Sequence, residues 1–194
     1  MRKRRRGGLN FGRQKKKINM AIVKEVFSWV IEIAITLLLA FTFVYFIGLR
    51  TSVVGQSMAG TLNAGDEILV NRFVYKMMDP KPNDIIVFLP NGNQKSHFYI
   101  KRVIAVPGDT VLIENGVIYV NGEVFDDEIE APSIVEAGLA AEEITLEEDE
   151  YFVLGDNRNN SEDSRYANIG NIKKEHIIGK AWFRVAPLSD IGFL

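Results

Sequence analysis

The chain has 194 residues, which suffices for one domain of ordinary size and an additional segment. It contains 23 Lys and Arg against 25 Asp and Glu, but ten of the basic residues and none of the acidic ones lie within residues 1–24. The remaining, strongly acidic part would repel a nucleic-acid backbone, and the absence of cysteine excludes disulfides and thiolate metal sites.

Residues 1–24 are interpreted as a basic cytoplasmic tail. Positive charges flanking an apolar segment keep that end of the chain on the cytoplasmic side of a membrane. The same charges are expected to contact anionic lipid headgroups, so membrane lipid is an expected partner and nucleic acid is not.

An apolar run follows from Val26 to Leu49, in which Glu32 is the one charged residue. As a helix its 24 residues would measure roughly 36 Å, enough to cross a bilayer core of about 30 Å. A buried core helix or a cleaved signal peptide would be the alternatives, but the run is too long for the latter and Gly48-Leu49-Arg50-Thr51 offers no cleavage site. We therefore predict a single-pass anchor over 25–49 in the cell (plasma) membrane and an extracytoplasmic domain over 50–194.

The domain after the anchor has the pattern of strands and tight turns. Asn115-Gly116 and Asn121-Gly122 separate β-rich runs, and Asn-Gly between such runs is a strong hairpin signal. This predicts a mainly β, antiparallel domain with strands at Glu67–Val74, Ile85–Leu89, Phe98–Val106, Val111–Ile113, Val117–Val120, Glu123–Phe125, Tyr151–Leu154 and Gly179–Val185.

Residues 126–150 differ from the rest, with 11 acidic residues among 25 and no basic one. This composition predicts an exposed insertion or a mobile loop between strands. A surface for a basic partner is a second interpretation.

The stretch "GQSMAGTL", Gly55–Leu62, places Ser57 shortly after the apolar run. His97 could converge with Asp84 and Asp109 into a Ser-His-Asp triad, but His97 and His176 both lie in polar stretches typical of solvent-facing residues.

Lys101 is the more informative cation, since it lies beside Arg102 in an otherwise apolar strand. Neighbouring side chains in a strand point to opposite faces, so one of the two cations is expected among apolar neighbours. A desolvated lysine loses its proton near neutral pH and can act as a general base, whereas arginine cannot. An edge strand with both cations reaching water is the alternative.

A third polar segment, Gly155–Arg165, directly follows the apolar strand Tyr151–Leu154. Calcium bound by Asp156, Asn157, Asn160 and Asp163 is conceivable, but the spacing is irregular and two arginines would repel the ion. Neither a metal nor a cofactor is expected.

Four ordered motifs behind an anchor resemble those of the type I signal peptidases, in particular the short single-anchor bacterial form. The nucleophile motif Ser-Met-x-Pro-Thr-Leu is similar to Ser57–Leu62, and Gly-Asp-(apolar)-Val-Phe to Asn83–Phe88. Lys-Arg-Val-(apolar)-(small)-x-Pro-Gly-Asp matches Lys101–Asp109, and Gly-Asp-Asn-Arg-x-x-Ser-x-Asp-Ser-Arg matches Gly155–Arg165.

The resemblance implies a Ser-Lys protease in which Ser57 is the nucleophile and Lys101 the general base. It implies that Ser161 hydrogen-bonds the lysine amine and that an Asp163–Arg165 ion pair braces the site. It further implies that Arg102 faces away from Lys101 and that Met58 and Ile100 contact substrate. The wall behind the site would be formed by Gly155, Asp156, Asn157 and Arg158.

The resemblance also implies the substrates, which would be signal-peptide-bearing preproteins cut after small residues at Ala-x-Ala-like sites. The protein export machinery is a further expected partner. Two residues depart from the family pattern: Gly60 replaces the motif proline, and Gly55 stands where some members have a serine that assists the oxyanion.

Two alternatives remain open from the sequence. One is a related Ser-Lys protease with a single dedicated substrate or with self-cleavage, as in repressor-type autoproteases. The other is an anchored β module that binds a partner through residues 126–150 and does not need Ser57 or Lys101.

Overall fold

The computed structural model describes residues 19–194, and the chain divides into two units, Met1–Phe41 and Thr42–Leu194. Most of the predicted tail, residues 1–24, therefore lies outside the described residues. The long helix α1 spans Met20–Ile47, and its segment Met20–Phe43 is long and apolar enough to cross a membrane. The apolar side chains along α1 that the structure describes are exposed, as a lipid-facing helix requires.

The boundaries of this helix differ from the predicted 25–49. It begins five residues earlier and ends two residues earlier, because Leu49 already belongs to strand β1 and pairs with Val70. An apolar run alone does not mark the point where a helix gives way to a strand of similar composition.

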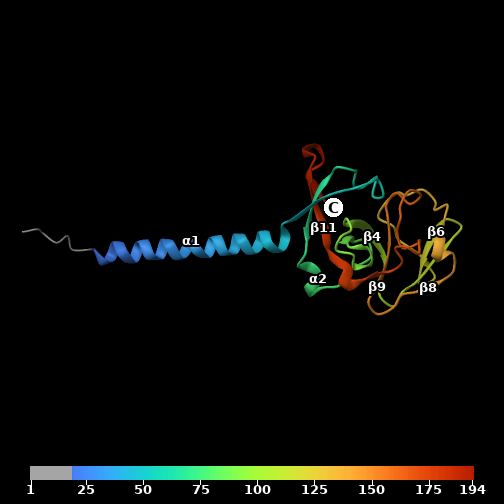
Figure 1. Cartoon of the computed structure of the whole chain (residues 1–194), viewed down its shortest axis with the longest axis horizontal. Helices are drawn as coiled ribbons and strands as arrows, with labels where there is room; N and C mark the ends of the chain where they lie inside the picture. Colours follow the sequence, from blue (N-terminus) through green and yellow to red (C-terminus); the bar gives the residue numbers. More distant parts are fainter. Residues whose placement is uncertain (1–18) are drawn as a thin grey trace, which may run out of the picture. The chain divides into compact units, whose positions relative to one another are not determined.

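The second unit is built from two antiparallel sheets, as Figure 1 shows with β4, β9 and β11 in one and β6 and β8 in the other. The larger sheet has the order β1-β2-β11-β3-β4-β9-β10, with β12 pairing β11. Its strands are β1 Leu49–Ser52, β2 Glu67–Asn71, β3 Ile85–Phe88, β4 Tyr99–Ala105, β9 Glu150–Leu154, β10 Ile172–Lys173, β11 Ile177–Ala186 and β12 Gly192–Phe193. The predicted mainly β, antiparallel class is confirmed.

The smaller sheet has the order β7-β6-β5-β8. Asn115-Gly116 and Asn121-Gly122 form its two tight turns with positive φ at all four residues, the conformation for which Asn-Gly is favoured. Its strands are β5 Thr110–Glu114, β6 Val117–Val120, β7 Glu123–Val124 and β8 Ile144–Thr145. The short helices of the unit are α2 Val74–Met77, η1 Pro90–Gly92, η2 Gly138–Ala141, η3 Lys174–His176 and η4 Leu188–Asp190.

Strand β4 lies at the centre of the larger sheet and contributes to three apolar clusters. Ile104 packs with residues of the smaller sheet, Ile100 with β1–β3 neighbours, and Val103 with β9 and the segment that follows it. These contacts and the pairing with β3 fix the backbone of β4, and therefore the origin of the Lys101 side chain.

The predicted strand Glu67–Val74 is too long at its C-terminal end. Strand β2 ends at Asn71, whose side-chain oxygen accepts hydrogen bonds from the N–H groups of Phe73 and Val74. This Asx turn diverts the chain into α2, which begins at Val74.

Most of residues 126–150 are exposed, as their charge predicted, but the segment is also anchored to the domain by a few buried residues. The segment buries Ile134, Ala140 and Leu146 against the smaller sheet, and the N–H of Leu139 donates a hydrogen bond to the carbonyl of Arg165. At Gly138, with φ +58, a Cβ would lie 2.3 Å from that same carbonyl. Three apolar residues of the segment thus belong to the core while Val135 and Leu139 stay exposed, and net charge does not reveal that division.

Candidate active site

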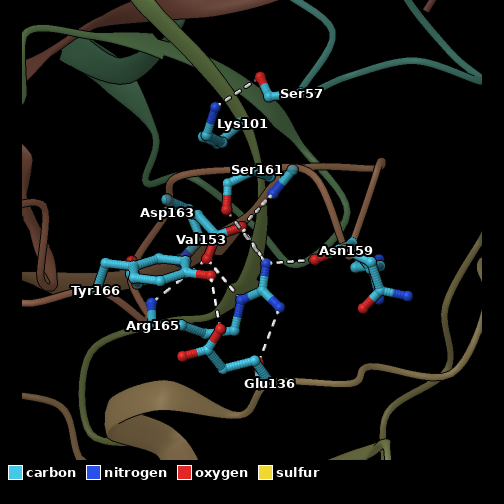
Figure 2. Close-up of polar contacts among 12 residues, drawn as sticks. Ser57, Lys101, Glu136, Val153, Asn159, Ser161, Asp163, Arg165 and Tyr166 are labelled. Atoms are coloured by element: carbon cyan, nitrogen blue, oxygen red, sulfur yellow. Dashed lines mark hydrogen bonds and ion pairs between the residues drawn. The ribbon is translucent and has the colours of Figure 1, made fainter.

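The two predicted catalytic side chains are in contact. Lys101 Nζ, from β4, donates a hydrogen bond to Ser57 Oγ at 2.7 Å, and Figure 2 shows the two groups pointing toward each other. Ser57 is half-buried in the turn after β1, whereas Lys101 is 3% exposed. Ser57 and Lys101 are 44 positions apart in sequence, and they meet because β3 and β4 carry Lys101 back beneath the turn.

The surroundings of Lys101 favour its neutral form. Burial lowers the pKa of Lys101 to about 8 from an ordinary 10.5, and the negative charges of Asp163, Glu162 and Asp156 oppose this while Arg165 reinforces it. In the part of the chain that the structure describes, no carboxylate lies within salt-bridge distance of the amine. Desolvation without a paired counter-charge is the physical reason for the lowered pKa.

A groove of about 300 Å³ opens at Ser57 and Lys101. Three segments line it: residues 53–58 before and within the turn, residues 97–101 leading into β4, and the loop after β9. Met58 and Ile100, the predicted substrate-contacting residues, both line it and are almost completely buried at its floor. The full lining is Val53, Val54, Gly55, Gln56, Ser57, Met58, His97, Phe98, Tyr99, Ile100, Lys101, Asn160 and Glu162.

The turn that carries Ser57 is closed by backbone hydrogen bonds. The N–H groups of Thr61 and Leu62 both donate to the carbonyl of Met58, at 3.1 and 2.7 Å. Gly60 has φ +107 within this turn, a conformation that proline cannot adopt. The departure from the family motif at this position therefore accompanies a different local backbone, in which glycine is favoured.

The loop Gly155–Arg165 holds the backbone of Ser57, the predicted nucleophile. The N–H of Asn157 donates to the carbonyl of Ser57 at 3.0 Å, and its side-chain amide donates to the carbonyl of Gln56 at 3.1 Å. A Cβ at Gly155 would lie 2.4 Å from the Ser57 carbonyl and 2.2 Å from Ser161 Oγ, so only glycine permits this approach.

The predicted ion pair between Asp163 and Arg165 is present and completely buried. Arg165 Nε and Nη2 donate to the two carboxylate oxygens at 2.7 and 2.9 Å, and the same carboxylate accepts the N–H of Gly155 at 3.1 Å. Arg165 also donates to the carbonyls of Arg158 and Glu136 (Figure 2). One guanidinium thus ties both arms of the loop to the segment 126–150.

Arg102 faces away from Lys101, as expected from strand alternation, but it is also buried, with 5% exposure. Its Nε and Nη2 donate to both oxygens of Asp156 at 2.9 and 2.8 Å. Lys101 is buried as expected, and the burial of Arg102 on the opposite face was not predicted. Both faces of β4 are covered, and the guanidinium is accommodated by a bidentate partner.

The expected hydrogen bond from Ser161 to the lysine amine is not made. Ser161 is 8% exposed, and its Oγ has no hydrogen-bond partner among residues 19–194. Arg158 is also buried; its Nη2 lies 2.6 Å from Asp127, and it faces residues 126–150 rather than the groove.

The other sites considered from the sequence are not assembled. Asp84 accepts the Tyr75 hydroxyl and pairs with Lys180, Asp109 accepts from Asn121, and His97 lies exposed at the groove mouth. The calcium interpretation fails because Asp156 and Asp163 are taken by arginines. Residues 19–194 contain no group of His, Cys, Asp and Glu that could hold a metal.

Two bracing contacts were not predicted. Arg184 of β11 donates to the Thr61 carbonyl and to Asp66, both at 3.0 Å, and so holds the end of the nucleophile turn. The Glu136 carbonyl accepts from Arg165. Neither Arg184 nor Glu136 belongs to a recognisable motif, and two of the three acceptors are backbone carbonyls, which leave no signal in the sequence.

Comparison with known proteins identifies the family of the chain. A family model described as "Signal peptidase, peptidase S26" matches residues 26–186. "Probable signal peptidase I-2" from Synechocystis sp. is 37% identical over 159 residues, covering 76% of this chain and 70% of the relative. "Signal peptidase I P" from Bacillus subtilis subsp. natto is 35% identical over 174 residues, covering 86% and 92%.

Among solved structures, the crystal structure of a signal peptidase I from Enterococcus faecalis is 28% identical, with a TM-score of 0.41. The match covers 53% of this chain and 97% of the solved chain. The extent of the family match, together with relatives more than 30% identical over most of their length, confirms the resemblance carried by the four motifs. The chain belongs to the signal peptidase family, peptidase S26, and is a serine peptidase.

Proposed function

We propose that this chain is a membrane-anchored endopeptidase that removes N-terminal signal peptides from exported preproteins, with Ser57 as nucleophile and Lys101 as general base. The observation that carries the proposal is the 2.7 Å contact between Ser57 Oγ and the nearly inaccessible Lys101 amine, at the floor of an open groove. A nucleophile within hydrogen-bond reach of a base with a lowered pKa is the arrangement that acyl transfer needs.

In the proposed mechanism, neutral Lys101 accepts the hydroxyl proton as Ser57 Oγ attacks the scissile carbonyl. The resulting ammonium then protonates the leaving amine, and an acyl-enzyme remains on Ser57. Lys101, again neutral, takes a proton from water, and the hydroxide formed attacks the ester. As the acyl bond breaks and the signal peptide is released, the Lys101 ammonium returns that proton to Ser57 Oγ. Each transfer uses the same short path between nitrogen and oxygen, so one base serves both halves of the reaction.

The oxyanion is assigned to the backbone N–H of Ser57. Within residues 19–194 this N–H donates to no acceptor, while the Ser57 carbonyl is fixed by Asn157. A rigid, unoccupied donor directed at the reacting centre stabilises developing charge without reorganisation. Gly55 offers no hydroxyl for a second donor.

Substrate is proposed to bind as an added strand beside the first residues of β4. Strand β9 pairs with β4 from Arg102 to Ala105, so the backbone of Tyr99–Lys101 has no strand partner on that side within the described chain. Backbone pairing supplies affinity that does not depend on sequence, while the narrow apolar floor at Met58 and Ile100 admits small side chains. This combination fits Ala-x-Ala-like cleavage sites.

The helix α1 is proposed to be a single-pass anchor in the cell membrane, with the tail in the cytoplasm and the peptidase domain outside. Ser57 lies ten residues after Ile47, a stretch that spans roughly 33 Å at most. The active site is thereby kept within reach of signal peptides that emerge from the bilayer.

Activity is tested with detergent-purified protein and a preprotein that carries an Ala-x-Ala site. Wild type and Ser189→Ala, a matched change at an exposed serine outside the groove, are expected to cleave equally. Ser57→Ala and Lys101→Ala are expected to lose cleavage. Wild-type rates in either variant would contradict the mechanism, and cleavage that is lost only with a chelator would point to a metal.

Topology is tested with single cysteines, which the cysteine-free chain makes unambiguous. Asn10→Cys and Ser189→Cys are labelled in intact spheroplasts with a membrane-impermeant maleimide. The proposal expects labelling of the second position alone until the membrane is opened; the reverse pattern would overturn the orientation.

A further inference from the structure

The loop Gly155–Arg165 carries three carboxylates, and only two of them have a partner. Asp156 is paired with Arg102 and Asp163 with Arg165, both in buried ion pairs. Glu162 lies between them in sequence but is exposed, and it makes no ion pair within the part of the chain that the structure describes. Its charge is therefore available to an incoming molecule.

Glu162 lies at the mouth of the catalytic groove. Among the residues that line that groove it is the one carboxylate, and the remaining lining is apolar or uncharged except for Lys101 at the floor and the titratable His97. The family motif leaves the position between Ser161 and Asp163 open, so Glu162 is not one of the fixed residues of that motif.

We propose that Glu162 is a specificity-determining residue that favours substrates with a basic side chain close to the scissile bond, at a position whose side chain leaves the groove. This inference rests on the proposed function. In an extended substrate, alternate side chains point away from the floor that holds the small residues, and such a side chain reaches the exposed rim where Glu162 lies.

The size of the effect follows from exposure. An ion pair between exposed groups contributes little in water, so a discrimination of about 2- to 5-fold between lysine and glutamate at the favoured position is expected at low ionic strength. The same exposure makes this discrimination sensitive to salt, because at 1 M ionic strength exposed charges are screened beyond about 3 Å.

Glu162 also has an intramolecular effect that provides a second readout. Together with Asp163 and Asp156 it raises the pKa of Lys101 against the larger lowering by burial and the contribution of Arg165. Removing the carboxylate is expected to lower the pKa of Lys101, which moves the acidic limb of the pH–rate profile to lower pH. A merely structural role for Glu162 would not produce this shift.

The test uses the full chain in detergent and a set of Ala-x-Ala peptides. They carry Lys, Gln or Glu at the position two before the cut, or at the first or second position after it. Wild type is expected to cleave the Lys peptide with a higher kcat/KM than the Glu peptide at one of these positions. Glu162→Gln should bring the ratio to about one, Glu162→Lys should invert it, and 1 M salt should reduce it.

The control is Glu148→Gln, which neutralises an exposed glutamate outside the groove and should retain the wild-type ratio. A ratio near one in wild type, or a ratio unchanged in both Glu162 variants, would overturn the inference. If the Gln peptide is cleaved in a Ser57-dependent manner while no charge preference exists, this inference alone fails. If no peptide is cleaved, the proposed function fails with it.

Discussion

The two faces of β4 each bury a cation, and they treat it in opposite ways. On one face Arg102 donates to both oxygens of Asp156, so its charge is fully compensated. On the other face Lys101 is buried with its amine between the Ser57 hydroxyl and the Tyr99 ring, and no carboxylate of the described chain pairs with it. A buried cation becomes reactive only where no carboxylate pairs with it, because desolvation then favours its neutral form. Where a carboxylate does pair with it, the buried cation stays charged and stabilises the structure.

The largest effect is expected on the Lys101 face. Lys101→Met keeps the length of the side chain and removes the base, so kcat should fall by at least about 10³-fold. Because it removes a desolvated amine, the melting temperature should stay the same or rise. Peptide cleavage and thermal unfolding of the same preparation measure both, and a clear loss of stability would mean that Lys101 is also a structural cation.

The Arg102 face should respond in the opposite sense. Arg102→Met leaves Asp156 buried without its partner, which is expected to cost about 3–5 kcal/mol of unfolding free energy. Denaturant titration measures this cost, and the double change Arg102→Met with Asp156→Leu should recover much of it. A single variant as stable as wild type would show that the pair does not brace the site.

The comparison also predicts a pH dependence. With a pKa of about 8, Lys101 is mostly protonated at pH 6 and cannot accept the Ser57 proton. The rate should therefore rise about tenfold per pH unit below 8 and level off above it. Single-turnover cleavage between pH 6 and 10 measures the profile; a plateau that already begins at pH 6 would contradict a neutral-lysine mechanism with this pKa.

The smallest effect concerns the turn that carries Ser57, where Arg102 donates to the Thr61 hydroxyl and Arg184 to the Thr61 carbonyl. Gly60 has φ +107 and no atom within 4 Å of a built Cβ, so Gly60→Ala should cost roughly 1 kcal/mol through backbone strain alone. The change Gly192→Ala, where φ is unremarkable and space is open, is the control. Equal unfolding free energies for the two variants would mean that the turn relaxes at no cost.

Much of the fold follows from local signals in the sequence. The Asn-Gly dipeptides specify their hairpins because positive φ is a local requirement, and the apolar runs give the central strands to within one or two residues. The segment 126–150 could not be placed, because its packing depends on Ile134, Ala140 and Leu146 meeting a sheet formed elsewhere. Asn71 ended a strand that propensity alone would continue.

The sequence predicted which residues form the site better than it predicted the contacts between them. Motif order and strand alternation identified Ser57 and Lys101 as residues that should meet. The Arg102–Asp156 pair and the position of Arg165 between Glu136 and Arg158 are long-range contacts between elements whose relative placement no local pattern encodes. Local patterns also could not show that Ser161 Oγ makes no hydrogen bond to the Lys101 amine, although the resemblance implied one.

The backbone of Tyr99–Lys101 pairs with β3 on one side and has no strand partner among residues 19–194 on the other, and this open side has an evolutionary consequence. If recognition rests on main-chain pairing and two small side chains, most substitutions around a cleavage site leave it readable. The exported proteins of a cell can then diverge, and new ones can be recruited, without a matching change in the peptidase. Selection would then keep the groove residues unchanged. Substitutions at Glu162, on the exposed rim, could alter the preferred substrate charge without changing the recognition of small residues.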